Sequence, residues 1–238
     1  MPVRVEVSLS PALYPFRTIK DGHTTVAIDV LRATTAVCAA FQAGCETVVP
    51  LDSLEPLPHY RAMGYSIAAE RGGKKVAGAE YGNSPTEYLS QDMSDVRLAY
   101  STTNGTVCIL RGSDAEQTLA GSFANISSLV AKLRSDRKDV VLLCSGWQND
   151  FCIEDTLLAG AVIEKLSDTA EPHGDAAQMA LALWQVAKND PYDYCRRATH
   201  VHRLEGFGAG EDVKFAFRCD TCPVVPILKD GRLILCND

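Results

Sequence analysis

Polar side chains cluster at the points where apolar segments of the sequence end. The segments 24–28, 65–69, 96–100 and 140–143 are typical of buried strands, and each is followed by acidic, hydroxyl, amide or glycine residues. In an open α/β sheet, ligands bind beyond the carboxyl ends of the strands. We therefore expect the clusters to converge on one cleft, which suits an enzyme for a small anionic substrate. The clusters are 29–35, 70–73, 82–85, 101–106, 144–146 and 154–156.

Alternating strand and helix patterns position these clusters along the first 166 residues. Residues 24–31 form a continuous apolar run, which suits a buried strand, and the small residues of 33–43 suit a helix that stops at Gly44. The alternation predicts an α/β fold with a largely parallel sheet and right-handed crossovers. We expect further strands at 3–9, 47–51, 65–70, 96–101 and 139–143, and further helices at 54–63, from Pro85, at 125–134 and at 154–166.

The pattern changes beyond Leu166. We expect residues 167–238 to form a smaller α+β portion that packs on the main α/β portion of residues 1–166, with a separate domain as the alternative. The segments of this portion are a helix at 175–188, the stretches 195–204 and 212–217, and a hairpin of 224–228 and 232–235 around Gly231.

The composition limits the classes of function. With 238 residues, of which 46% are hydrophobic, the chain can bury a sizeable core. A formal net charge of -7 argues against a nucleic-acid or anionic-membrane partner, because both need a basic face. No apolar stretch reaches the roughly 18 to 20 residues of a membrane span, and the N-terminus lacks a signal-peptide core. The nine cysteines lie mostly in apolar segments, which fits a reducing compartment. We therefore expect a cytoplasmic protein. Its oligomeric state is not specified, and a homodimer stays open.

Taken together, the clusters resemble the motifs of the 2-phosphosulfolactate phosphatase family. The match runs in order from about Thr25 to Leu166, and five motifs in sequence with fitting spacing are specific although each is weak alone. The resemblance implies a three-layer α/β/α fold. It also implies a Mg²⁺-dependent hydrolase that converts 2-phospho-3-sulfolactate to 3-sulfolactate and phosphate, a step toward coenzyme M. The motifs are 29–35, 70–73, 82–88, 102–106, and Cys144-Ser145-Gly146 followed by 154–160.

Four acidic residues are the candidate metal ligands under this resemblance. They are suitable because a hard cation such as Mg²⁺ prefers carboxylate oxygens and polarises phosphoryl oxygens. Asp29 at a strand end could instead cap the helix that begins near Ala33. Glu154 and Asp155 open an apolar-faced helix, where acids also complement the helix dipole, and at most one of the two need face the cleft. We predict a metal site of Asp29, Glu70, Glu154 and Asp155, with Asp29, Glu70 and Glu154 catalytic.

Two arginines are the candidate partners for the anionic groups of the substrate. Arg32 follows Asp29 closely, and its guanidinium could hold a phosphate bidentately, which makes it a candidate catalytic residue as well. Arg71 precedes Gly72 and Gly73, which would let the backbone approach a ligand. We predict that Arg32 contacts the phosphate and that Arg71 contacts the sulfonate or carboxylate. The alternative is that each forms an ordinary ion pair.

Two loops carry candidate substrate-binding residues without net charge. Asn83 and Ser84 offer an amide and a hydroxyl, although they also form a typical helix start. The loop after the predicted strand at 96–101 could present N–H groups to an anion, and its alternative is an ordinary strand-to-helix turn with capping hydroxyls. Its candidate residues are Thr102, Thr103, Asn104, Gly105 and Thr106.

The C-terminal third matches the family less well. A Ser/Thr-x-His-Gly-like element is expected there, whereas residues 198–203 read Ala-Thr-His-Val-His-Arg, without the glycine. The roles of His200 and His202 therefore stay open. Cys219 and Cys222 resemble half of a zinc site, but one Cys-x-x-Cys pair is more typical of two reduced cysteines near a strand end.

Two functional hypotheses follow from different classes. The first is a Mg²⁺-dependent phosphomonoesterase, in which a metal, arginines and N–H donors neutralise charge on the phosphoryl oxygens. We favour attack by water, with an aspartyl-phosphate on Asp29 as the alternative. The second is a non-catalytic binding module of the same fold for a sulfonated or phosphorylated acid. The carboxylate clusters argue against it, because an anion sensor gains nothing from negative charge unless a metal binds there. Another small phospho-acid as the substrate stays open.

Overall fold

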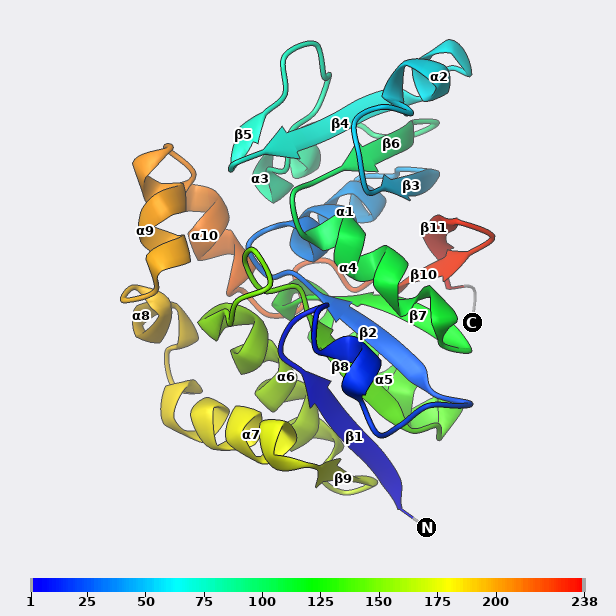
Figure 1. The fold of residues 1–238 in the computed structure, drawn as a ribbon. Coiled ribbons are helices and arrows are strands. Elements are labelled where there is room, and N and C mark those ends of the chain that lie inside the picture. The colour runs from blue at the N-terminus through cyan, green and yellow to red at the C-terminus, as the bar shows by residue number, and fades with distance from the viewer. Residues whose placement is uncertain (1, 237–238) are drawn as a thin grey trace.

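One mixed β-sheet with helices on both faces forms the centre of the computed structural model, which describes residues 2–236 (Figure 1). The strands are β1 (Val3–Ser8), β2 (Thr24–Ile28), β3 (Thr47–Leu51), β4 (Ser66–Arg71), β5 (Lys74–Lys75), β6 (Arg97–Ser101), β7 (Gln117–Gly121), β8 (Val140–Cys144), β9 (Ala170–His173), β10 (Pro226–Lys229) and β11 (Arg232–Leu235). The helices are α1 (Ala33–Gln42), α2 (Leu57–Ala62), α3 (Pro85–Leu89), α4 (Gly105–Arg111), α5 (Ile126–Asp136), α6 (Ile153–Leu166), α7 (Asp175–Ala187), α8 (Pro191–Cys195), α9 (Thr199–Gly206) and α10 (Gly210–Ala216).

The sheet is largely parallel, as the alternating pattern predicts. Its strand order is β5-β4-β6-β3-β11-β10-β7-β2-β8-β1-β9. Strands β4, β6 and β3 run parallel to one another, and so do β7, β2, β8, β1 and β9. The short edge strand β5 is antiparallel to β4. The hairpin of β10 and β11 separates these two groups and lies antiparallel to β7 on one side and to β3 on the other.

The C-terminal third completes the main sheet. The β10–β11 hairpin pairs with the edges of β3 and β7, which would otherwise expose unpaired backbone N–H and C=O groups. Strand β9 extends the same sheet beyond β1. The segment 212–217 is helical for most of its length, as part of α10. Within residues 167–236, the strands β9, β10 and β11 thus belong to the same sheet as the strands of the α/β portion. The division into a main α/β portion and a smaller α+β portion stays a prediction.

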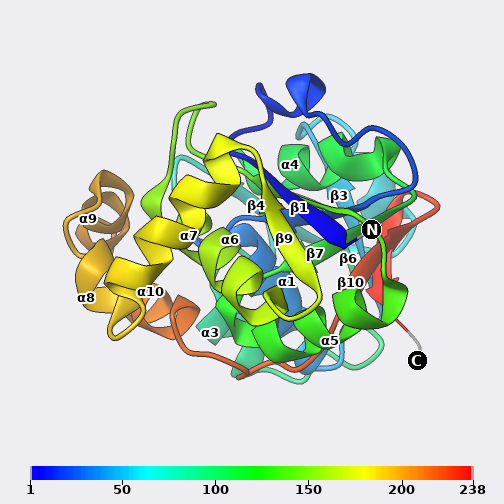
Figure 2. The same ribbon diagram turned by 90° about the horizontal axis from the view of Figure 1, so that it is seen from below.

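Three layers result because successive side chains of a strand point to opposite faces. Val26 and Ile28 of β2 belong to a buried apolar cluster with helices α5, α6 and α7. Ala27, between them, belongs to a second cluster with α1 and α4. Figure 2 shows α4 on one side of β1 and helices α6 and α7 on the other. The three-layer α/β/α fold that the family resemblance implies is therefore confirmed.

Strand β7 is the main element that the sequence pattern misses. Its five residues, Gln117–Gly121, mix polar, apolar and small side chains and show no clear alternation. The strand forms because β2 pairs with it on one side and β10 on the other, so the neighbouring strands rather than its own residues specify it. Within residues 2–236, no helix combines the length and the apolar character needed to cross a membrane.

Candidate active site

Polar side chains from three strand ends and from helix α9 line one small cavity. Asp29 follows β2, Glu70 lies near the end of β4, and Asn104 lies in the turn after β6. Figure 1 shows α9 in orange on the side of the molecule toward which the arrow of β4 points. The strand-end clusters therefore converge. The lining residues are Asp29, Leu31, Arg32, Glu70, Gly73, Asn83, Thr103, Asn104, His200, Arg203 and Leu204.

Asp29 is buried at the point where β2 meets the turn into α1. Its Oδ1 accepts a hydrogen bond from the backbone N–H of Ala33 at 3.1 Å. Helix α4 begins against the same carboxylate, since a Cβ at Gly105 would lie 2.5 Å from Oδ2 of Asp29, a distance that only glycine avoids. Burial raises the pKa of Asp29 to about 6, and the negative charges of Glu70 and Glu154 act in the same direction.

Glu70 is oriented by backbone N–H groups from two loops. Gly73 N–H donates to Oε1, and Thr103 N–H donates to Oε2 at 3.2 Å. The hydroxyl of Thr103 also lies within 3.3 Å of Oε1. These contacts fix the carboxylate between the end of β4 and the turn after β6. Glu70 faces the cavity, but the hydrogen bonds leave it less free to coordinate a cation than Glu154, whose Oε2 has no partner among the described residues.

Glu154 pairs with a histidine from the C-terminal part of the chain. Its Oε1 lies 2.7 Å from Nδ1 of His200, and its buried Oε2 has no hydrogen-bond partner among the described residues. On the other side of the imidazole, Nε2 of His200 lies 3.0 Å from Nη2 of Arg203. The guanidinium carbon of Arg203 lies 4.8 Å from the centre of the Trp147 ring. Helix α9 thus brings a histidine and an arginine to the acids of the strand ends.

Asp155 has a different environment from its neighbour Glu154. Its Oδ1 accepts the backbone N–H of Val30 at 2.9 Å. Its Oδ2 accepts from the Ser145 hydroxyl and from the Gly146 N–H, each at 3.1 Å. Burial, followed by the charges of Glu154 and Asp29, raises the pKa of Asp155 well above its ordinary value. Asp155 therefore ties α6 to two strand-end loops and does not line the cavity, so its position does not support the predicted metal contact.

Arg32 lines the cavity and is held from two sides. Its Nη1 donates to Asp212 Oδ2 at 2.7 Å, and Nη2 donates to the carbonyl of Gly73 at 3.0 Å. Both members of the Arg32–Asp212 ion pair are buried. The other oxygen of Asp212 accepts from the hydroxyls of Ser84 and Thr86. Helix α10 therefore positions the arginine that the sequence assigns to the phosphate.

Arg71 points to the backbone of the sheet. Its Nη1 donates to the carbonyls of Glu70 and Ser101, and its Nη2 donates to the Ser101 hydroxyl at 2.9 Å. It does not line the cavity. These contacts connect β4 to β6, so the position of Arg71 does not support the predicted contact with the sulfonate or carboxylate.

The predicted loop residues divide between lining the cavity and capping helices. Asn83 lines the cavity, and its Oδ1 accepts from the Tyr100 hydroxyl, so the amide N–H groups are what it can donate to a ligand. Thr103 and Asn104 also line the cavity, whereas Gly105 makes room for Asp29. The remaining residues act locally. The hydroxyl of Ser84 caps α3, and Thr102 and Thr106 cap one another.

The donor atoms fit a hard cation better than a soft one. Asp29, Glu70 and Glu154 supply carboxylate oxygens, and the unpartnered Oε2 of Glu154 is a buried acceptor that a cation would satisfy. Cys152, Glu154 and His200 also lie together, with one ligand atom of each within 4.8 Å of the others. Burial raises the pKa of the Cys152 thiol, and the charge of Glu154 acts in the same direction.

The cysteine pair of the C-terminal part joins no histidine. Cys219 is exposed, Cys222 is buried, and both are free. Among the described residues, the one group of three or more potential ligands is that of Cys152, Glu154 and His200. The two-cysteine motif therefore has no partners for a zinc site in this part of the chain.

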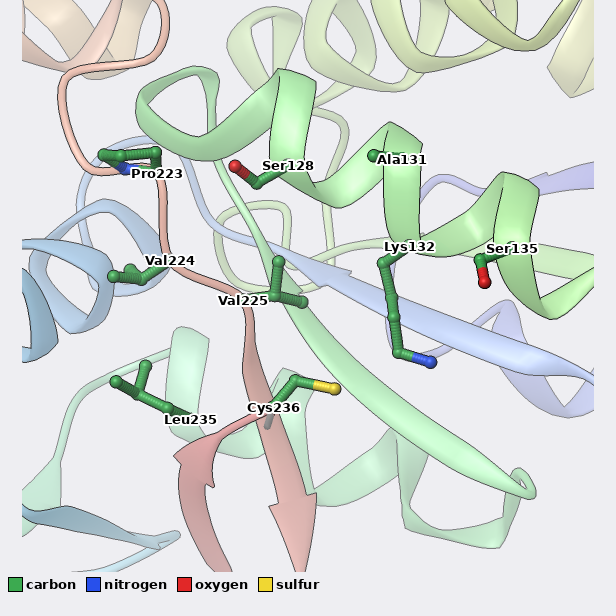
Figure 3. Close-up of a pocket in the computed structure, with 9 residues that line it drawn as sticks. All are labelled: Ser128, Ala131, Lys132, Ser135, Pro223, Val224, Val225, Leu235 and Cys236. Atoms are coloured by element: carbon green, nitrogen blue, oxygen red, sulfur yellow. The ribbon is translucent and has the colours of Figure 1, made fainter. Parts of the chain in front are cut away.

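A larger cavity lies away from the polar clusters. It measures about 600 Å³ and opens between α5 and the segment that enters and leaves the C-terminal hairpin (Figure 3). Its one charged lining residue is Lys132, whose ammonium group pairs with Asp136. No lining residue is acidic or a histidine, so acid–base and metal chemistry belong to the smaller cavity. The lining residues are Ser128, Ala131, Lys132, Ser135, Pro223, Val224, Val225, Leu235 and Cys236.

The sequence pattern alone misses two residues of the cavity region, Arg203 and Asp212. Arg203 lies three residues after His200, a spacing that places both on one face of a helix, so an expected helix at 199–206 would have predicted them together. Asp212 carries no such signal, because its contact with Arg32 depends on the packing of α10. The structure also places His200, whose role the motif leaves open, beside Glu154.

Comparisons with known proteins agree with the resemblance. A family model described as 2-phosphosulpholactate phosphatase matches residues 8–231. A probable 2-phosphosulfolactate phosphatase of Thermotoga petrophila is 36% identical over 215 residues, which are 90% of this chain and 93% of the relative. A protein of the same name from Caldanaerobacter subterraneus subsp. tengcongensis is 31% identical, over 90% of this chain and 91% of the relative. Another from Gloeothece citriformis is 34% identical, over 95% of this chain and 96% of the relative. The chain therefore belongs to the 2-phosphosulpholactate phosphatase family, a family of phosphoric monoester hydrolases.

Proposed function

We propose that this chain is a Mg²⁺-dependent phosphatase that hydrolyses 2-phospho-3-sulfolactate, or a similar small phospho-acid, to 3-sulfolactate and phosphate. The names of the relatives support this substrate. The observation that carries the proposal is the meeting of two buried acids, Asp29 and Glu70, with Arg32 and a polar loop at one cavity. A third buried acid, Glu154, contacts the lining residue His200. A cluster of buried carboxylates is unfavourable by itself, which supports a cation at this place.

Asp29, Glu154 and Glu70 would hold the ion in this proposal. When bound, it would supply positive charge to the oxygens of the transferring phosphoryl group. Asp155 is not included, because it does not line the cavity and both of its oxygens accept hydrogen bonds. Glu70 lines the cavity, and Glu154 keeps Oε2 without a partner among the described residues. Mg²⁺ is favoured over zinc because the free donor atoms are carboxylate oxygens.

The chain's own groups would bind the phosphate and limit its movement. Arg32, with its guanidinium held by Asp212 and by the Gly73 carbonyl, offers its remaining N–H groups to two phosphate oxygens. The amide of Asn83 is a further donor at the same cavity. Because these groups are already positioned by buried partners, little reorganisation accompanies the reaction. Water is the nucleophile in this proposal, and inversion at a chiral phosphorus would distinguish it from an aspartyl-phosphate on Asp29, which gives retention.

A phosphate-release assay on a panel of small phospho-acids tests the proposal. We expect hydrolysis of 2-phospho-3-sulfolactate that a chelator abolishes and that added Mg²⁺ restores. Hydrolysis that survives exhaustive chelation would contradict the metal assignment. Tight binding of the panel with no turnover at any Mg²⁺ concentration would identify a binding module instead. Efficient hydrolysis of a different phospho-acid, without hydrolysis of 2-phospho-3-sulfolactate, would support the phosphatase activity but contradict the proposed substrate.

A further inference from the structure

Arg203 is the cavity arginine whose charge no protein carboxylate balances. Arg32 forms a buried ion pair with Asp212, whereas none of the ion pairs among residues 2–236 includes Arg203. The Nε atom of Arg203 is buried and has no hydrogen-bond partner among these residues. A buried N–H donor without a partner is uncommon, and it is explained most simply by a ligand that accepts from it.

Two neutral neighbours orient the guanidinium of Arg203. The ring of Trp147 lies under it, with 4.8 Å between the guanidinium carbon and the ring centre. Nη2 lies 3.0 Å from Nε2 of His200. Arginine can only donate, so Nε2 must accept, and the proton of the imidazole then sits on Nδ1, which donates to Glu154 at 2.7 Å. The acid, the histidine and the arginine therefore form one oriented chain of hydrogen bonds.

We propose that Arg203 binds the acid group of the substrate that is not transferred, and that His200 positions it. The inference rests on the proposed phosphatase function. Its basis is the juxtaposition of an unpaired cavity arginine on α9 with Arg32 on the strand-end side of the same cavity. A small phospho-acid carries its phosphate and its sulfonate or carboxylate a few bonds apart, so it needs two cationic partners. A planar guanidinium can pair with two oxygens of either acid group.

Arg71 cannot take this place, because its guanidinium donates to the Glu70 and Ser101 carbonyls and to the Ser101 hydroxyl. Arg203 instead lines the cavity and keeps its Nε–H unpaired. The assignment moves the second anion contact from the motif region of the sequence to the C-terminal third, where the family-like element lacks its glycine. Substrate preference within this scaffold would then depend on α9.

Three substrates distinguish the acid group that Arg203 contacts. They are 2-phospho-3-sulfolactate, 2-phospholactate, which lacks the sulfonate, and 2-phosphooxyethanesulfonate, which lacks the carboxylate. We expect Arg203→Lys to lower kcat/KM by about 10- to 100-fold, mainly through KM, on every substrate that keeps the contacted group. The substrate that lacks this group should be affected little. Arg197→Lys is the matched control, because Arg197 is an exposed arginine that stacks on Tyr194 near the same helix.

Variants of His200 test its positioning role. In His200→Gln, the amide extends to about the position of Nε2 and can still accept from Arg203. In His200→Asn, the shorter amide extends only to about the position of Nδ1, so it can donate to Glu154 but does not reach Arg203. If His200 positions Arg203, KM rises more in His200→Asn than in His200→Gln for the substrates that carry the acid group contacted by Arg203. Equal effects of the two variants on all three substrates would indicate a general structural role and contradict this part.

Binding of 3-sulfolactate by calorimetry tests the inference without turnover. We expect Arg203→Lys to weaken binding by about 10-fold or more, with an unchanged melting temperature. Unchanged binding, or equal losses on all three phosphate esters, would overturn the assignment of Arg203. If the wild-type chain hydrolyses none of the panel but binds 3-sulfolactate through Arg203, the proposed phosphatase function fails and the anion contact stands.

Discussion

The strand-end loops and the C-terminal helices contribute to the same cavity in different ways. In the loops, backbone N–H groups orient the acids: Ala33 for Asp29, and Gly73 and Thr103 for Glu70. At α9 and α10, contacts between pairs of side chains orient the polar groups. The helices supply His200, Arg203 and Asp212 to these pairs. The acids of the loops are therefore oriented by backbone groups next to the sheet. The helices α9 and α10 instead contact the site through side chains, and these contacts also help to hold the helices in place.

The two neighbours Glu154 and Asp155 show the same difference within one helical turn. Glu154 turns toward His200 of α9 and keeps one oxygen unpartnered. Asp155 turns toward the loops after β2 and β8 and accepts their N–H groups. Sequence position places both at the start of α6, but only the packing of α9 distinguishes the acid that contacts His200 from the acid that joins the strand-end loops.

The largest expected effect comes from the loop acids. We expect Asp29→Asn to lower kcat/KM by about 100-fold or more, because an amide keeps the shape of the side chain but weakens binding of a cation. The melting temperature should change little, since the side chain keeps an acceptor for the Ala33 N–H. Steady-state kinetics at saturating Mg²⁺ together with thermal unfolding measure both quantities. Near-normal Mg²⁺-dependent turnover would make Asp29 a structural helix cap.

Two arginines with the same net charge should respond differently to replacement by lysine. We expect Arg32→Lys to lower kcat/KM by about 10- to 100-fold, because a point charge cannot contact Asp212, the Gly73 carbonyl and a phosphate together. Arg71→Lys should instead lower the free energy of unfolding by about 1 kcal/mol, because the hydrogen bonds between β4 and β6 are lost. Kinetics and denaturant unfolding of both variants make the comparison. A rise in KM in Arg71→Lys but not in Arg32→Lys would instead support a contact between Arg71 and the substrate.

A smaller effect is expected where one acidic side chain connects two helices. Glu164 of α6 accepts from Trp184 Nε1 and Lys188 Nζ of the α7 region, which together lower its pKa to about 2. The ionised form therefore stabilises the fold at pH values above the ordinary pKa of 4.5, and this stability is lost as the pH falls toward 2.

Glu164→Gln measures this contribution. Because the side chain is about one-third exposed, we expect a loss of about 1 kcal/mol or less at pH 7. The difference in stability between wild type and variant should shrink between pH 4.5 and pH 2, as followed by denaturant unfolding. A difference that stays constant over this range would show that packing rather than charge is involved.

The smallest effect is expected from the cysteine pair. Replacing Cys219 and Cys222 by Ser should leave activity nearly unchanged and change the melting temperature little, because neither cysteine belongs to a group of metal ligands among the described residues. A structural zinc site would supply folding energy directly, so its loss would be obvious. Stoichiometric zinc in the purified protein, measured by elemental analysis, would contradict this prediction and would make the C-terminal part metal-stabilised.

Local patterns were sufficient for most elements and for the strand-end part of the site. The apolar run of β2, the small residues of α1 and the buried face of α6 specify their own secondary structure through periodicity. Because parallel strands place their carboxyl ends together, the positions of Asp29, Glu70, Thr103 and Asn104 in one cavity followed from sequence as well.

Long-range packing decided the rest. The five residues of β7 become a strand only because β2 and β10 pair with both of its edges, and the β10–β11 hairpin enters the sheet from 100 or so residues further along the chain. Likewise, no local pattern distinguishes Arg203 from Arg71. One guanidinium lies over Trp147 at the cavity, and the other donates to carbonyls of the sheet, because α9 packs against the strand ends whereas Arg71 lies between two neighbouring strands. Hydrogen-bond partners far apart in the sequence set the roles of these side chains, and only the folded chain brings those partners together.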